Sequence, residues 1–151
     1  MAFTAMVFLS QAAVRTVMSS IDDGTTGSLT FEVGACAPGD TVTFNGGLDT
    51  IYLNIGEVTL GNNITIIGNG STILNGNGAS RAFNVSATVF LEQLDIYNCF
   101  NAGNGGAIVS TGILTLTNVD IHDCIASGQG GALHISSNLT MDNCSILNNQ
   151  A

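Results

Sequence analysis

Acidic side chains that recur at a fixed interval are the residues of this chain best suited to chemistry. Asp95 and Asp120 lie 25 positions apart, and His122 and Asp123 follow closely after Asp120. A glycoside hydrolase needs two carboxyl groups that flank a sugar bond, and Ca²⁺ prefers carboxylate oxygens as ligands. A polysaccharide lyase needs, in addition, a base beside such carboxylates. The acidic residues therefore suggest three kinds of site.

The set of residues for catalysis is incomplete. The chain has two basic residues, Arg15 and Arg81, and neither is in register with the acidic pair. We therefore expect no catalytic residues, and we interpret the acidic side chains as a solvated face. The carboxylates of Asp95, Asp120 and Asp123 are the candidates for a Ca²⁺ site, although no EF-hand loop or calcium-binding nonapeptide array accompanies them.

Composition and spacing argue against several other classes of ligand. Two Lys and Arg against eleven Asp and Glu give a formal charge of −9, so no basic patch is available to neutralise nucleic acid. His122 and His134 lack the paired spacing of zinc ligands, and no glycine-rich stretch is followed by the Lys of a phosphate loop. We expect no cofactor, no nucleic-acid partner and no membrane-spanning helix.

The 25-residue interval belongs to a repeat that must position these side chains. Gly105-Gly106-Ala107-Ile108 returns 25 residues later as Gly130-Gly131-Ala132-Leu133. Apolar residues keep the same interval where identity is lost, and each such set is called a column here. The three columns are Val89, Leu114 and Leu139; Leu91, Leu116 and Met141; and Ile96, Ile121 and Ile146. Buried positions repeated in this way are typical of a solenoid.

Alternation of apolar and polar residues predicts three short strands in every coil. The strands expected first in their coils are 41–44, 63–67, 88–91, 113–117 and 138–142, and two further sets follow in each repeat. The expected fold class is all-β, a single-stranded right-handed parallel β-helix with about 25 residues per coil. A sandwich, an antiparallel barrel or a leucine-rich repeat would leave this register or its residue pattern unexplained.

The two ends of the chain differ in pattern. Residues 1–40 are expected to form an N-terminal segment and cap, in which 1–13 are either the remnant of an export signal or a short element over the core. Residues 41–151 are expected to form the β-helix. Because no covering segment follows the last coil, we expect the helix to continue beyond residue 151 or to be covered by another copy.

Several motifs resemble those of a known group of exported proteins. The two Gly-Gly-Ala-apolar segments and 146–149 resemble the GGAI and FxxN repeats of polymorphic outer-membrane proteins and autotransporter passengers. Gly27-Ser28-Leu29 and the segment 38–44 resemble a CSLREA-like N-terminal cap. Thr30 stands where that cap usually has Arg, Ile146 replaces Phe, and Cys99 and Cys124 occupy the position of the FxxN Asn. The resemblance implies a pectate-lyase-like superfold and a surface role.

The four cysteines do not form a recognisable metal-binding or disulfide framework. Cys99 and Cys124 occupy the same position on successive coils, and Cys144 falls in an apolar column. Neighbouring parallel strands lie about 4.8 Å apart, which a disulfide can span. Buried free thiols and a bridge between Cys99 and Cys124 both remain open, with free thiols favoured; Cys36 lies outside the register.

Together these observations favour an exported, non-enzymatic β-helix at the cell surface or outside the cell, acting as a stalk, adhesive or structural passenger. Its expected partners are itself, or the rest of a longer β-helix, through the C-terminal coil, and glycans or a host surface. One alternative is the N-terminal part of a carbohydrate-active enzyme. Another is an ice-binding solenoid, suggested by a Thr column that Phe90 interrupts: Thr43, Thr65, Thr115 and Thr140.

Overall fold

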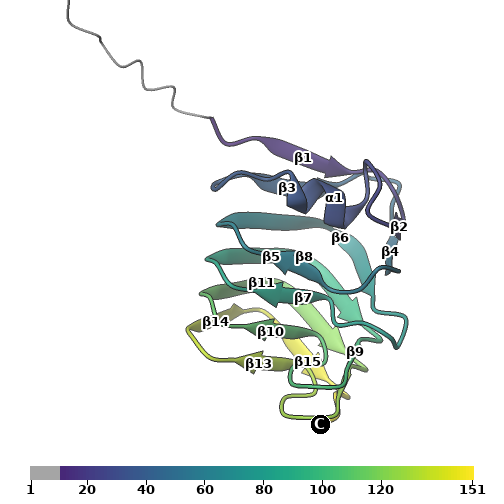
Figure 1. Ribbon diagram of the computed structural model, residues 1–151, viewed down its shortest axis with the longest axis vertical. Coiled ribbons are helices and arrows are strands. Elements are labelled where there is room, and N and C mark those ends of the chain that lie inside the picture. Colours follow the sequence, from purple (N-terminus) through teal and green to yellow (C-terminus); the bar gives the residue numbers. More distant parts are fainter. Residues whose placement is uncertain (1–10) are drawn as a thin grey trace, which may run out of the picture.

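The computed structural model describes residues 11–151, which form an all-β parallel β-solenoid of about five turns with about 25 residues per coil. The strands stack one above another along the long axis, from β1 near one end to β13 near the other (Figure 1). The N-terminal part of the expected signal remnant, residues 1–10, lies outside the described residues. Within the described part, no helix is long and apolar enough to cross a membrane.

Three parallel sheets run along the solenoid. The first contains nine strands, namely β1 (Val14–Val17), β2 (Ile21–Asp22), β3 (Thr41–Phe44), β4 (Thr50–Leu53), β6 (Ile64–Asn75), β8 (Val89–Tyr97), β11 (Leu114–His122), β14 (Leu139–Asp142) and β15 (Ser145–Leu147). The second contains β5 (Val58–Leu60), β7 (Phe83–Val85), β10 (Ile108–Ser110) and β13 (Leu133–Ile135). The third pairs β9 (Phe100–Asn101) with β12 (Ile125–Ala126).

In the middle of the solenoid, the first and second strands expected in a coil form one continuous strand. β6, β8 and β11 each cross a bend without interruption. At the bend, Gln93 and Asn118 adopt φ values of 54° and 53°, and the ladder resumes on the far side with Val119 paired to Leu94. A single residue in the left-handed region therefore turns the strand, and Asn tolerates that region better than most residues.

The apolar columns form the core in the predicted register. Leu114 pairs with Val89 on one side and with Leu139 on the other, and Ile121 pairs likewise with Ile96 and Ile146. The members in the inner coils are almost fully buried, whereas Leu139 is partly buried, and Met141 and Ile146 are 39% and 40% exposed. The last coil thus has the same pattern of side chains as the others, but these side chains are less deeply buried.

The expected alignment of the Thr column is wrong by two residues at β3. The expectation places Thr43 beside Thr65, but the structure pairs Thr65 with Thr41, and Thr43 with Ile67. The error arises because β3 and β6 are not separated by the regular repeat, so a polarity pattern of period two fits either alignment. Phe90 does interrupt the column, since it pairs with both Thr65 and Thr115.

The N-terminal segment joins the solenoid through buried polar contacts. β1 pairs with β3, so the parallel sheet begins before residue 41. Helix α1 (Leu29–Gly34) follows, and Ser28 accepts a hydrogen bond from the Phe31 amide at its start. The backbone amide and the hydroxyl of Thr30 both donate to the fully buried Asp22 carboxylate, at 2.8 and 2.7 Å. Thr30 thus binds Asp22 at the position where the CSLREA-like cap usually has Arg.

The repeated glycines occupy a corner that excludes side chains. Gly105 and Gly130 both have φ of 70°, and a Cβ on either would overlap the carbonyl oxygen three residues further on. Gly106 approaches the backbone of Gly131 in the next coil just as closely. The Gly-Gly-Ala-apolar motif is therefore explained by a tight left-handed turn followed by a close contact between coils.

We expect Ile121→Ala to lower the free energy of unfolding by ~2–5 kcal/mol, because a side chain that is 1% exposed would leave a cavity between two coils. Ile146→Ala removes the same atoms from the same column, but at a position that is 40% exposed, and should cost less than half as much. Urea denaturation of both variants measures the difference. Equal losses would contradict the assigned core.

Candidate functional site

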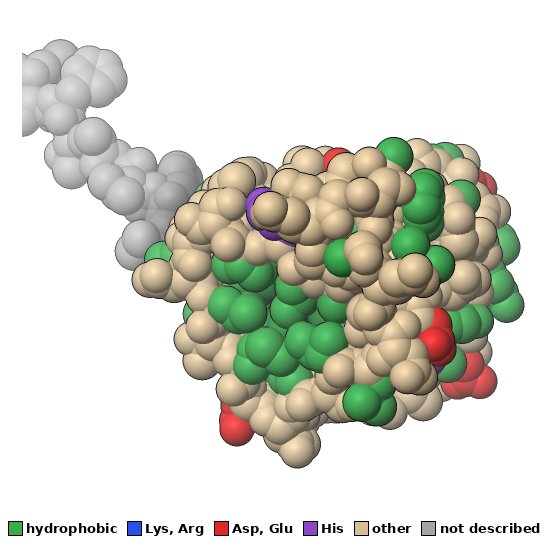
Figure 2. Space-filling view, turned by 90° about the horizontal axis from the view of Figure 1, so that it is seen from below, with side chains coloured by type: hydrophobic (Ala, Val, Ile, Leu, Met, Phe, Trp, Pro, Cys, Tyr) green, Lys and Arg blue, Asp and Glu red, His purple; other side chains and the backbone are tan. Residues whose placement is uncertain are grey.

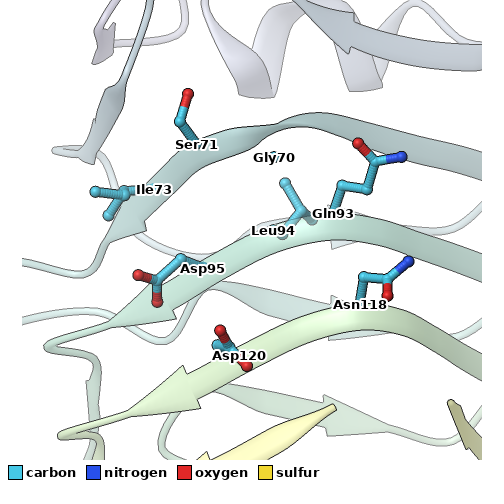
Figure 3. A pocket seen from close by; sticks show the side chains of 8 residues that line it. All are labelled: Gly70, Ser71, Ile73, Gln93, Leu94, Asp95, Asn118 and Asp120. Atoms are coloured by element: carbon cyan, nitrogen blue, oxygen red, sulfur yellow. The ribbon is translucent and has the colours of Figure 1, made fainter. Parts of the chain in front are cut away.

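A groove runs beside the bend of the long strands, on the outside of the solenoid. Its main cavity has a volume of about 330 Å³ and is lined by residues of three successive coils: Gly70, Ser71, Ile73, Gln93, Leu94, Asp95, Asn118 and Asp120 (Figure 3). A second hollow of about 300 Å³ shares Asn118 and Asp120 and extends to Asn143 and Ser145. The groove therefore follows the solenoid axis towards its C-terminal end.

One wall of the groove is a row of amide side chains. Gln93, Asn118 and Asn143 occupy equivalent positions on successive coils, and all three have φ values between 50° and 54°. The Asn143 amide donates to the Asn118 carbonyl oxygen. Gly68 allows the preceding coil to approach this wall, because a Cβ there would overlap the Gln93 carbonyl. The same backbone bend thus makes the hollow and provides its hydrogen-bonding groups.

The other wall contains the acidic pair noted in the sequence. Asp95 and Asp120 are register partners on β8 and β11, and Ser145 continues the row on β15. Burial raises the pKa of the Asp95 carboxyl above its ordinary value; His122 opposes the rise, and the Asp120 charge adds to it. A carboxyl group that holds its proton more tightly therefore stands next to a second carboxylate.

His122 links this wall to the next corner. Its Nε2 atom lies 3.0 Å from Asp95 Oδ1, and its Nδ1 atom lies 2.8 Å from Asp123 Oδ2. The Asp95 oxygen lacks hydrogen-bond geometry, so the contact is an ion pair when the imidazole is protonated. Hydrogen bonding to Asp123 raises the pKa of the imidazole, burial lowers it, and the Asp95 charge raises it further. When His122 is protonated, its imidazole balances part of the charge of the acidic wall.

Sequence reasoning missed two residues that support His122. The Tyr97 ring stacks on the imidazole, with ring centroids 5.4 Å apart and planes inclined by 24°. The Asn75 amide donates to the Tyr97 hydroxyl over 2.8 Å. The repeat could have revealed the contact between Tyr97 and His122. The two residues lie 25 positions apart, and rings at equivalent positions of adjacent coils lie over one another.

The three calcium candidates do not form a metal site. Among residues 11–151, no group of three or more His, Cys, Asp or Glu side chains is arranged to hold a metal ion. Asp95 and Asp120 share the groove, whereas Asp123 lies beyond the corner, where it contacts His122. Asp123 therefore pairs with His122 instead of completing a set of carboxylates.

The other histidine, His134, lies on β13, where its Nε2 atom is 3.4 Å from the Asn104 amide nitrogen.

The FxxN-like element has a clear structural role in the last coil. Asn149 Oδ1 accepts from the Cys124 amide, and Asn149 Nδ2 donates to the Ile121 carbonyl.

Comparison with protein-family models, curated proteins and solved structures finds no match to the chain. The specific passenger-type resemblance stays a prediction that rests on these motifs.

The contacts of His122 give a pH dependence with a definite sign. The pKa of His122 in the folded state lies above its ordinary value of 6.5. The stabilisation by His122 is therefore fully present below pH 6.5, and it is lost as the pH rises through the pKa of the folded state. We therefore expect the free energy of unfolding to fall as the pH rises above about 6.5.

Urea denaturation across this range should show that the fall is smaller in His122→Gln and unchanged in His134→Gln. An identical pH profile for His122→Gln and the wild type would contradict the assigned ion pairs.

Proposed function

We propose that this chain is a non-enzymatic β-solenoid shaft of an exported surface protein, and that its last coil is a docking surface for a further solenoid coil. For the chain alone, the available partner is a second copy. The observation that carries the proposal is the apolar end face. Viewed from that end, hydrophobic side chains gather at the centre, and acidic side chains lie towards the margin (Figure 2).

The composition of the end face supports stacking. Leu133, Leu139 and Cys144 are partly buried against the core, and Met141 and Ile146 are more exposed, at 39% and 40%. The edges of the last parallel strands offer backbone donors and acceptors of the kind that pair with another strand. Solenoids gain much of their stability from contacts between neighbouring coils, so a coil-shaped partner matches both the apolar centre and the strand edges.

Export and a surface location are further parts of the proposal. They are supported by the resemblance of the Gly-Gly-Ala-apolar segments and the FxxN-like element to repeats of exported proteins. The low content of charged residues, 9%, fits a shaft whose surface is made of Asn, Thr, Ser and Gly. A stalk of this kind holds a distal domain or an adhesive surface away from its anchor.

We expect the chain to self-associate through this face, and Ile146→Lys or Met141→Lys to weaken the association roughly tenfold or more, since each variant places a charge in an apolar contact worth about 1.5 kcal/mol or more. Ile113→Lys is the matched control, because Ile113 is 45% exposed and lies one coil away from the end. Sedimentation velocity over a concentration series measures the association. A monomeric wild type, or equal weakening by Ile113→Lys, would contradict the docking surface.

A second candidate function is carbohydrate cleavage in the groove. The specific observation in its favour is that Asp95, with a raised pKa, stands beside Asp120 on the adjacent strand. Their backbones lie one strand spacing apart, about 4.8 Å, and retaining glycosidases likewise hold their two carboxyl groups close together. In this reading, protonated Asp95 is the general acid, and Asp120 is the nucleophile. A neutral glycan is favoured over an acidic one by the charge of −9.

Incubation with neutral oligosaccharides, with release of reducing ends as the readout, separates the two functions. If the groove cleaves glycans, Asp95→Asn and Asp120→Asn should each lose at least about a hundredfold in rate while still binding the oligosaccharide in calorimetry. Asp23→Asn, which removes one charge in the N-terminal turn, should retain full activity. Absence of turnover in the wild type would eliminate this candidate and leave the shaft.

A further inference from the structure

Two cysteines face each other across adjacent coils in the interior of the solenoid. Cys99 directly precedes β9 and Cys124 directly precedes β12, and these strands pair with Phe100 opposite Ile125. The Ile125 amide donates to the Cys99 carbonyl over 2.9 Å, which fixes the two coils together at this point. Neighbouring parallel strands place equivalent Cα atoms about 4.8 Å apart, inside the range that a disulfide spans.

The two side chains are enclosed at equivalent positions of adjacent coils. Cys99 is 1% exposed, and Cys124 is fully buried. A thiol–thiol hydrogen bond raises the pKa of Cys99, which burial raises further, and lowers the pKa of Cys124 against the effect of its burial. Gly76 leaves room for the pair, because a Cβ at that position would overlap the Cys99 sulfur. The pair therefore occupies one enclosed space between two coils.

The other two cysteines have no such partner. Cys36 lies beside helix α1, where its thiol contacts the Glu32 carbonyl at 3.3 Å. Cys144 follows β14 in a column whose other members are Leu94 and Val119. Of the four cysteines, only Cys99 and Cys124 occupy equivalent positions on successive coils.

We propose that Cys99 and Cys124 are a redox modification site, at which a small-molecule disulfide oxidises the pair to an intramolecular disulfide between two coils. The thiolate of one cysteine attacks one sulfur of the oxidant and releases one thiol from it. The sulfur of the other cysteine then attacks the mixed disulfide and releases the second thiol. The protein loses two protons and two electrons, and the oxidant takes up both as two reduced thiols.

Burial determines when this reaction takes place. An oxidant cannot reach sulfurs that are 0–1% exposed while the coils are closed. Oxidation therefore occurs during folding or through local opening of the coils that contain β9 and β12. Once formed, the bridge is protected from external reductants by the same enclosure. This inference does not rest on the proposed function, since it concerns the interior and not the end face or the groove.

The test uses the full chain, unfolded and reduced, and then refolded with a mixture of reduced and oxidised glutathione. After an acid quench, intact mass and alkylation in denaturant should show the loss of two thiols and two hydrogen atoms, with two of the four cysteines still alkylated. Peptide mapping should join the segments that contain Cys99 and Cys124. The same oxidant added to folded, reduced protein should act more slowly than on the unfolded chain.

Two variants keep the outcome interpretable. The double variant Cys36→Ser/Cys144→Ser retains the pair and should form the same bridge, with a higher midpoint of thermal unfolding when oxidised than when reduced. Cys99→Ala should leave Cys124 with a glutathione adduct or a free thiol. The proposal would be overturned if the refolded wild type kept four free thiols under conditions that oxidise a reference dithiol peptide. A bridge that includes Cys36 or Cys144 would overturn it as well.

Discussion

Parallel stacking in register is the constraint on which the rest of this structure depends. Each coil places the same residue position directly over its counterpart at the spacing of neighbouring strands, about 4.8 Å. Most inward positions are therefore apolar in every coil, as Leu91 and Leu116 are, because a buried polar side chain needs a hydrogen-bond partner in place of water. The core consists of such columns, and each coil covers the apolar surface of the one before it.

The corners follow from the same constraint. A coil can stack on its neighbour only if both turn at the same position, and a turn at a single residue needs the left-handed region. Asn98, Asp123 and Asn148 form one such set, with φ values between 52° and 55°, and Gln93, Asn118 and Asn143 form the set beside the groove. Asn and Asp are suited to these positions because they accept that backbone conformation at low cost. Their outward side chains then provide the polar groups of the surface.

The register could be derived from the sequence, whereas the site could be derived only in part. The columns through Leu114 and Ile121 were predictable because inward positions repeat in every coil. The alignment of Thr43 was not, because the spacing between β3 and β6 departs from the repeat. The groove was also hidden: a polarity pattern shows that Asp95 and Asp120 share a face, but not that a bend at Asn118 hollows that face. Nor does it show that Asp123 turns away from them to meet His122.

Stacking also explains why so little charge remains and where it gathers. In a stack of equivalent positions, a charged residue that recurs lies over its own copy, and like charges in direct opposition destabilise a sheet. Uncharged Asn, Thr and Ser can recur without that cost, which agrees with a charged fraction of 9%. Asp95 and Asp120 are an exception, because they are paired acidic residues in adjacent coils. The structure compensates them with His122, whose imidazole contacts Asp95 and is held by Tyr97 and Asp123. Two stacked acidic residues do not stabilise a coil by themselves, so the contacts of His122 with Asp95 and Asp123 are what allow this pair to recur in adjacent coils.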